Sequence, residues 1–217
     1  LKIKKSKIRG QISQGMICSE KELGLGEDSS GIMVLDKDIK PGTKLTEALK
    51  LENLVFDLGI TPNRADCLSV RGIAREVATA YGLPLYFPQV SLKETDIEAG
   101  SELELQIDDP ELCALYQARI IKDISIAPSP AWMRYRLLAH KVRPINNIVD
   151  ITNYVLFELG QPLHAFDQDL IFGNKIRVAR SSAGQKFKTL DGQERTLTDQ
   201  DLLIWDAQKP VALAGVM

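Results

Sequence analysis

The chain has 217 residues, of which 44% are hydrophobic and 26% are charged, and its formal net charge at pH 7 is −2. This composition is typical of a globular protein with one or two domains. The charge excludes a broad basic surface for nucleic acid, so any contact with RNA is expected to be local. No apolar run approaches the roughly 18 to 20 residues of a membrane helix, and the first residues, LKIKKSKIRG, lack the apolar core of a signal peptide.

The three cysteines, Cys18, Cys67 and Cys113, lie far apart and form no CxxC pair. Their spacing fits neither a disulfide framework nor a zinc site, and each thiol is expected to be a small buried hydrophobe. The cysteine content therefore indicates a reducing compartment, and we expect a cytoplasmic protein.

Residues 1–48 are predicted to combine short strands with turns, because Gly or Pro recurs every few positions. GIMVL at 31–35 predicts a strand and KPGT at 40–43 predicts a turn. The segment is too short for a complete barrel, so we interpret it as the end of a small β domain. Because the first residue is Leu rather than Met, we expect a piece of a longer protein.

Residues 49–92 are predicted to form a small helical domain and a linker. The apolar residues of CLSVRGIAREVATAYG recur at helical spacing, with Asp66 or Ser69 as the cap and Gly82 as the stop. The polar residues 93–102 lead into a second domain.

Strand and helix signals alternate from about residue 103 onward, which predicts an α+β fold for the second domain, residues 93–217. SPAWMRYRLLAHK predicts a helix with Ser129 at the cap and Pro130 at the first helical position. The chain ends on an apolar run, so we expect this domain to continue beyond it. The predicted strands are LELQI (103–107), YQARII (116–121), KIRVAR (175–180), DLLIWDA (201–207) and PVALAGVM (210–217).

The stretch DITNYVLFELG predicts a short helix over 151–159, capped by Asp150 and ended by Gly160. Thr152 and Asn153 then fall in the first turn, where unpaired backbone N–H groups favour a carboxylate, a phosphate or a developing oxyanion.

Pro162 stiffens the return of the chain and brings His164 back towards that helix. Upstream, Arg143 adds a guanidinium and the two Asn residues of RPINN add amides, a set suited to binding a polar ligand or positioning a water. The alternative stays open: a single His beside apolar residues is most often structural, and Arg143 is then only a solvated charge. His140 is expected on the surface of the preceding helix.

Six longer stretches, read in order, resemble the beta subunits of bacterial phenylalanyl-tRNA synthetases. The likeness implies the end of an oligonucleotide-binding-like insertion at 1–48, a small helical domain at 49–92 and a truncated editing domain at 93–217. The editing domain of that family hydrolyses tyrosine wrongly attached to phenylalanine tRNA. The six stretches are SQGMICSEKELGLG, TPNRADCLSVRGIAREVATAYGLP, PSPAWMRYRLLA, RPINNIVDITNYVLFELGQPLHAFD, TLDGQERTLTDQDLLIWD and PVALAGVM.

The resemblance also implies an editing pocket that includes His164 and no metal ligand. We hypothesise that His164 is the catalytic residue, which orients the hydrolytic water through a hydrogen bond or as a general base. An acidic residue that the family uses to sense the tyrosine hydroxyl falls beyond Met217. The implied substrate-binding residues are Arg143, Thr152, Asn153, Pro162, Ala214 and Gly215.

The implied partners are the acceptor end of phenylalanine tRNA and an alpha subunit, in an α2β2 heterotetramer without membrane contact. Aminoacylation in the family uses ATP and magnesium in the alpha subunit, and no cofactor is expected in this chain. A different class of function stays open, a non-catalytic RNA-binding or subunit-scaffold module, for which KIKKSKIR, Arg134, Arg136 and Arg143 supply positive charge.

Overall fold

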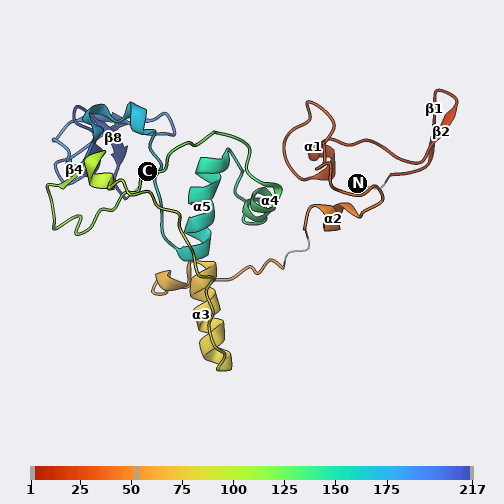
Figure 1. Ribbon diagram of the computed structural model, residues 1–217, viewed down its shortest axis with the longest axis horizontal. Coiled ribbons are helices and arrows are strands. Elements are labelled where there is room, and N and C mark those ends of the chain that lie inside the picture. The colour runs from red at the N-terminus through yellow and green to blue at the C-terminus, as the bar shows by residue number, and fades with distance from the viewer. Residues whose placement is uncertain (1–2, 52–53, 216–217) are drawn as a thin grey trace. The chain divides into compact units, whose positions relative to one another are not determined.

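The structure of the chain is a computed structural model that describes residues 3–51 and 54–215. It divides into two compact units, one formed by Leu1–Glu76 with Ile126–Leu163 and the other by Val77–Ser125 with His164–Met217. Helices and strands alternate in a mixed arrangement (Figure 1), which confirms the predicted α+β class. The predicted domain boundaries at 48 and 92 stay a prediction.

The N-terminal part of the first unit is a hairpin followed by two short helices. Strand β1 (Ser6–Ile8) pairs antiparallel with β2 (Gln11–Ser13), and the two turn residues between them have positive φ, as a tight hairpin requires. Helix α1 is Glu20–Leu23 and helix α2 is Leu45–Ala48.

The predicted turn at 40–43 is confirmed, since Thr43 N donates to Lys40 O (3.1 Å). The strand predicted at 31–35 is wrong. Met33 N donates to Cys18 O (2.8 Å), but no strand forms in this segment. An apolar run becomes a strand only where a ladder partner is present, and periodicity does not report the partner.

Helix α3 (Val70–Tyr81) confirms the predicted helix, and its two ends follow the predicted signals. The Ser69 hydroxyl accepts a hydrogen bond from Gly72 N (3.0 Å), so of the two candidate caps Ser69 is the one used. Gly82 follows with φ +63°, the left-handed conformation that ends many helices. A 3-10 turn, η1 (Ala65–Cys67), precedes the helix.

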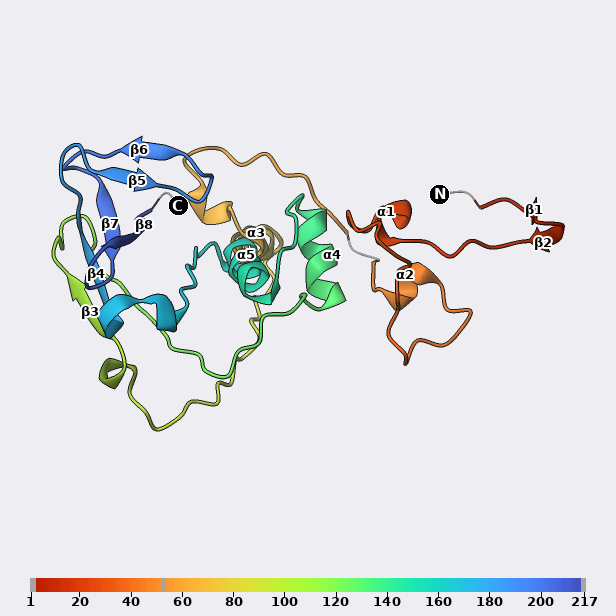
Figure 2. The same cartoon turned by 90° about the horizontal axis from the view of Figure 1, so that it is seen from above.

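Helices α4 (Ala131–Ala139) and α5 (Asn147–Leu159) pack side by side in the first unit, as Figures 1 and 2 both show. The predicted start of α4 is wrong by one residue, because Pro130 takes the cap position and no side chain caps the helix. Ser129 is not a cap, since its hydroxyl donates to a carboxyl group of α5 instead.

The predicted start of α5 is also wrong, and this error matters for the site. Asn146 is the cap, accepting from Ile148 N (3.1 Å) and Val149 N (3.0 Å), so the helix begins one turn earlier than predicted. Asp150 lies inside the helix and is fully buried, where it accepts from Ser129 Oγ (2.5 Å) and Ile145 N (2.8 Å). The predicted stop is confirmed, since Gly160 has φ +77°.

The second unit is built on a four-stranded sheet with the order β3-β4-β7-β8. Strand β3 pairs parallel with β4, and the other pairs are antiparallel. The strands are β3 (Glu104–Ile107), β4 (Lys175–Arg180), β7 (Leu202–Trp205) and β8 (Pro210–Leu213), with the hairpin β5 (Lys186–Lys188) and β6 (Glu194–Thr196) beside them in Figure 2.

Four of the five strands predicted for the second domain therefore form, and YQARII at 116–121 is the exception. Single 3-10 turns at Ala99–Ser101, Gln168–Leu170 and Phe172–Asn174 lie before the strands β3 and β4. One face of the sheet buries an apolar group, called here the sheet cluster, that consists of Ile171, Ile176, Ile204 and Ala212. Leu197, Leu203 and Leu213 form a second buried group.

All three cysteines are free thiols. Cys18 and Cys67 are buried as predicted, and Cys113 is only partly buried. Among the described residues, no helix combines the length and the apolar character that a membrane crossing needs.

Candidate functional site

Four of the predicted site residues, Arg143, Thr152, Asn153 and Pro162, belong to the first unit. Helix α5 carries Thr152 and Asn153, both half-buried, in its middle. The Thr152 hydroxyl donates to Val149 O (2.8 Å), one turn earlier in the helix. Arg143 and Pro162 are exposed, the first in the loop that enters α5 and the second in the loop that leaves it.

The first turn of α5 is not the open anion site that the sequence predicts. Thr152 and Asn153 lie in the second turn, where the backbone N–H groups bond within the helix. At the real N-terminus, the Asn146 side chain already takes the N–H groups of Ile148 and Val149. At Thr152 and Asn153 the helix therefore presents side chains rather than unpaired backbone N–H groups.

The buried carboxyl group of Asp150 holds the entrance loop in place. Its two hydrogen bonds tie Ile145, two residues after Arg143, and Ser129, which precedes α4, to the body of α5. Ala127 N donates to the Asn147 side chain (3.3 Å) and joins the same two segments. The backbone that carries Arg143 is thus anchored on α5 although the Arg143 side chain is exposed.

The other three predicted residues, His164, Ala214 and Gly215, belong to the second unit. The exposed His164 ring lies against Phe166, with 4.3 Å between the centroids and 31° between the planes. Phe166 packs on the sheet cluster, and Ala214 packs on the same cluster. Gly215 continues from Ala214 after strand β8 with φ +74°. Phe166 therefore links the imidazole to the apolar wall that also carries Ala214.

Partial burial against Phe166 lowers the pKa of His164 from its ordinary value of 6.5. The imidazole is therefore neutral at neutral pH. A neutral imidazole accepts a hydrogen bond or a proton through one ring nitrogen, which is what a water-orienting group or a general base requires.

The site residues thus form two groups, one on α5 and its flanking loops and one around the sheet cluster. Three residues hold these groups, namely Asn146, Asp150 and Phe166. The sequence pointed to Asn146 and Asp150 in other roles, as a ligand-binding amide and as the helix cap, and it missed Phe166. For Phe166 a signal was present: in an extended segment, residues two apart face the same side, so a ring two positions after His164 is placed to pack against it.

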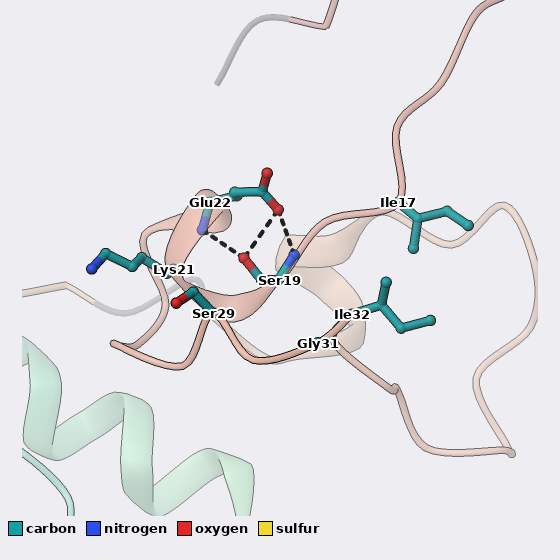
Figure 3. Close-up of a pocket in the computed structure, with 7 residues that line it drawn as sticks. All are labelled: Ile17, Ser19, Lys21, Glu22, Ser29, Gly31 and Ile32. Carbon is teal, nitrogen blue, oxygen red and sulfur yellow. Dashed lines mark hydrogen bonds between the residues drawn. The ribbon is translucent and has the colours of Figure 1, made fainter.

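A hollow of about 350 Å³ lies beside α1 in the first unit (Figure 3). Ser19 N donates to Glu22 Oε2 (2.8 Å) and Glu22 N donates to the Ser19 hydroxyl (3.3 Å), which together form a capping box. The backbone hydrogen bond from Ser19 lowers the pKa of the Glu22 carboxyl group. The polar groups of Ser19 and Glu22 thus bond each other and cap α1, so we do not interpret the hollow as a ligand site.

Asp66, Cys67 and Glu76 are the one group of potential metal ligands close enough together among the described residues. Arg64 already bridges the two carboxylates, at 2.9 Å from Asp66 and 2.6 Å from Glu76. The hydrogen bond from Arg64 lowers the pKa of Asp66 to about 2, while burial raises the pKa of Cys67 and disfavours the thiolate that a metal needs. The two carboxylates are thus ion-paired with Arg64, and Cys67 lies buried beside them.

Two family models match different parts of the chain. Residues 112–217 match the model described as "B3/4 domain", and residues 1–44 match the model described as "Putative tRNA binding domain". All seven predicted site residues fall within the first match.

Curated relatives are similar over the whole chain. The phenylalanine–tRNA ligase beta subunit of Nitratidesulfovibrio vulgaris is 58% identical over 99% of this chain and 27% of its own length. That of Oleidesulfovibrio alaskensis is 59% identical over 100% of this chain and 27% of its own length, and that of Staphylococcus saprophyticus is 44% identical over 100% and 28%. The chain therefore spans about a quarter of these relatives. Its sequence belongs to the phenylalanine–tRNA ligase beta-subunit family.

Proposed function

We propose that this chain supplies an editing site that hydrolyses tyrosine from mischarged phenylalanine tRNA. The observation that carries the proposal is the neutral, partly desolvated imidazole of His164, set on the apolar wall that also holds Ala214. The match of residues 112–217 to the B3/4 domain and the identity to ligase beta subunits support the same conclusion.

Editing answers a physical problem of selectivity. Tyrosine and phenylalanine differ by one hydroxyl, and an apolar pocket rejects an added hydroxyl only about a hundredfold. A second site that hydrolyses the wrong ester multiplies that selectivity. The ester is already activated, so a positioned water and stabilisation of the oxyanion are sufficient.

In the proposed mechanism, His164 accepts a hydrogen bond or a proton from the attacking water. Ala214 and Gly215 leave room for the aromatic ring, because they carry almost no side chain. Pro162 fixes the loop that leads from α5 to the histidine.

Thr152 and Asn153 hold the aminoacyl group or the terminal ribose in this proposal. The Thr152 hydroxyl already donates to Val149 O, so it is left to accept, which suits an ammonium or a ribose hydroxyl. The exposed guanidinium of Arg143 meets a phosphate of the RNA end.

The same proposal extends to the complete enzyme, in which a beta subunit works with an alpha subunit that carries out aminoacylation with ATP and magnesium. The Asp66, Cys67 and Glu76 group does not fit a magnesium ion, because Arg64 already pairs with both carboxylates and a thiol is a soft ligand. Within this chain, the proposed contribution is therefore hydrolytic editing by side chains.

The test is deacylation of tyrosyl-tRNA(Phe) by the full-length gene product assembled with its alpha subunit. We expect His164→Ala to slow the reaction by about 10² to 10⁴, the range of a lost general base, and to leave charging with phenylalanine unchanged. Gln161→Ala is the matched control, since this exposed side chain bonds only the Pro162 carbonyl among the described residues. Unchanged clearance by a folded His164→Ala protein would remove His164 from the mechanism.

A second function, RNA binding without chemistry, is favoured by the match of residues 1–44 to a putative tRNA-binding domain. Within the described segment, Lys4, Lys5, Lys7 and Arg9 make no ion pair and are exposed around the β1–β2 hairpin. If this function is the main one, replacing these four residues by Ala weakens tRNA binding and lowers its salt dependence, while His164→Ala changes neither.

A further inference from the structure

A stretch of the first unit departs from the charge balance of the rest of the chain. Residues 124–149 contain no Asp or Glu, whereas the whole chain has a net charge of −2. The stretch carries Arg134, Arg136, Lys141 and Arg143. Arg134 is neutralised by Glu20 at 2.7 Å, but Arg136, Lys141 and Arg143 have no carboxylate partner among the described residues.

Aromatic rings and one of these cations line the junction of α4 and α5. On α4, Trp132, Arg136 and His140 follow one another at intervals of four residues and are all exposed. Tyr154 and Phe157 of α5 lie beside them, half-buried. We call these five residues the α4–α5 strip.

The groups of the strip hold one another in defined positions. The Arg136 guanidinium lies over the Trp132 ring, 5.4 Å from its centroid, and donates to the Tyr154 hydroxyl (2.7 Å). The Tyr154 ring meets the Trp132 ring edge to face, with 5.4 Å between centroids. At the other end of the strip, the rings of His140 and Phe157 are stacked at 4.8 Å and 19°.

Packing between the two helices does not account for this arrangement. Apolar side chains would fill the junction equally well, whereas here Trp132 remains 42% exposed and Arg136 keeps an uncompensated charge in the described part of the chain. An exposed indole next to a fixed cation is instead the combination that proteins use to bind unpaired nucleic acid, with bases on the rings and phosphate on the cation.

We propose that the α4–α5 strip is a stacking platform for an unpaired RNA segment. Trp132 and His140 each take a base, and Arg136 between them binds the connecting phosphate. The two ring positions are eight residues apart, or about 12 Å along the helix, so the platform holds more than one nucleotide.

Three observations favour RNA over a protein partner. The three strip residues on α4 lie in the stretch 124–149, which has no acidic residue. The cations of this stretch that lack a carboxylate partner among the described residues match a polyanion, and the N-terminal segment of the same unit matches a putative tRNA-binding domain. Duplex RNA does not fit, because its bases are already stacked on one another. The choice of RNA rests on the proposed function, but the platform requires no hydrolysis.

The test is fluorescence anisotropy of a labelled, unstructured 12-nucleotide oligoribonucleotide with the full-length gene product. We expect Trp132→Ala to weaken binding about 5- to 150-fold, the range for one lost base–aromatic stack. Trp132→Phe should retain most of the affinity, whereas Trp132→Leu, with similar apolar bulk but no π face, should lose it. Arg136→Gln should reduce the slope of log K against log salt by about 1.

Tyr81→Ala is the matched control, because Tyr81 is an aromatic residue of α3 that is 77% exposed and lies outside the strip. His164→Ala should bind the oligonucleotide like the parent protein. The binding assay therefore tests the platform independently of the proposed editing activity. Equal affinity of Trp132→Ala and the parent would overturn the proposal. So would retained binding in Trp132→Leu, or a Trp132→Ala defect confined to assembly with the alpha subunit, which would identify the strip as a protein interface.

Discussion

Replacing Asp150 by Ala tests the contact that positions the entrance to α5. The substitution removes the acceptor for Ser129 Oγ (2.5 Å) and for Ile145 N (2.8 Å). A buried donor left without a partner costs about 1 to 3 kcal/mol. Ser129 is only 5% exposed, so its hydroxyl bears this cost in full, while Ile145 is 67% exposed and water can reach its backbone more easily.

The expected loss follows from these two burials. We assign a cost of about 2 to 3 kcal/mol to the unpaired Ser129 hydroxyl and about 1 kcal/mol to the unpaired Ile145 N–H. The higher helix propensity of Ala offsets up to about 0.7 kcal/mol of this cost. Asp150→Ala should therefore lower the free energy of unfolding by about 2 to 4 kcal/mol, a large share of the 5 to 15 kcal/mol typical of a domain.

Urea unfolding followed by circular dichroism measures this loss. Asp150→Asn is the control, because the amide oxygen still accepts from Ile145 N and the amide group still bonds the Ser129 hydroxyl, so it should lose less than half as much. Combining Asp150→Ala with Ser129→Ala should cost less than the sum of the two single changes, since both remove the same contact. A loss below about 0.5 kcal/mol for Asp150→Ala would refute the anchoring role.

Two further predictions concern α3 and the candidate histidine. Gly72→Ala would place a methyl group 2.0 Å from Asp66 O, so we expect the free energy of unfolding in urea to fall by at least about 1 to 3 kcal/mol. Gly59→Ala is the control, because no atom lies within 4 Å of the added methyl group, and it should change stability little. Equal stability of the two variants would contradict the clash. For His164, NMR titration should give a midpoint below 6.5, because partial burial disfavours the imidazolium. The unfolded chain then binds the proton more tightly than the folded chain. The stability that His164 contributes is therefore present above pH 6.5 and is lost as the pH falls. A midpoint at or above 6.5 would rule out this pH dependence.

The corrected start of α5 changes what this helix offers a substrate. Were Asp150 the cap, the backbone N–H groups near Thr152 and Asn153 would face the ligand and stabilise an anion. Because Asn146 is the cap, the helix presents side chains there, and the Thr152 hydroxyl is committed to Val149 O. Stabilisation of an oxyanion in the proposed mechanism must then come from groups other than the α5 backbone.

Local signals were sufficient where an element depends on its own residues. The period of α3 and its Gly82 stop are read from neighbouring residues, and the structure uses both. Of the two caps that the sequence left open, Asp66 and Ser69, the structure uses Ser69. Strands β4, β7 and β8 were equally readable, because each alternates or concentrates apolar residues that the sheet buries.

Local signals failed where an element depends on a partner elsewhere in the chain. GIMVL at 31–35 and YQARII at 116–121 have strand-like composition, but neither pairs with another strand in the structure. Asn146 and Asp150 have nearly equal capping ability, so the sequence alone does not choose between them.

The sequence by itself indicated the family and the α+β class, and it supplied the residues proposed for the polar site at 143–164. The tertiary structure decided which polar side chain caps α5, which one is buried as an anchor, and that His164 rests on Phe166. The physical reason is that a capping or anchoring side chain gains free energy only from the donors that folding brings to it. The donors of Ser129 and Ile145 reach Asp150 only after α4 and the entrance loop have packed on α5.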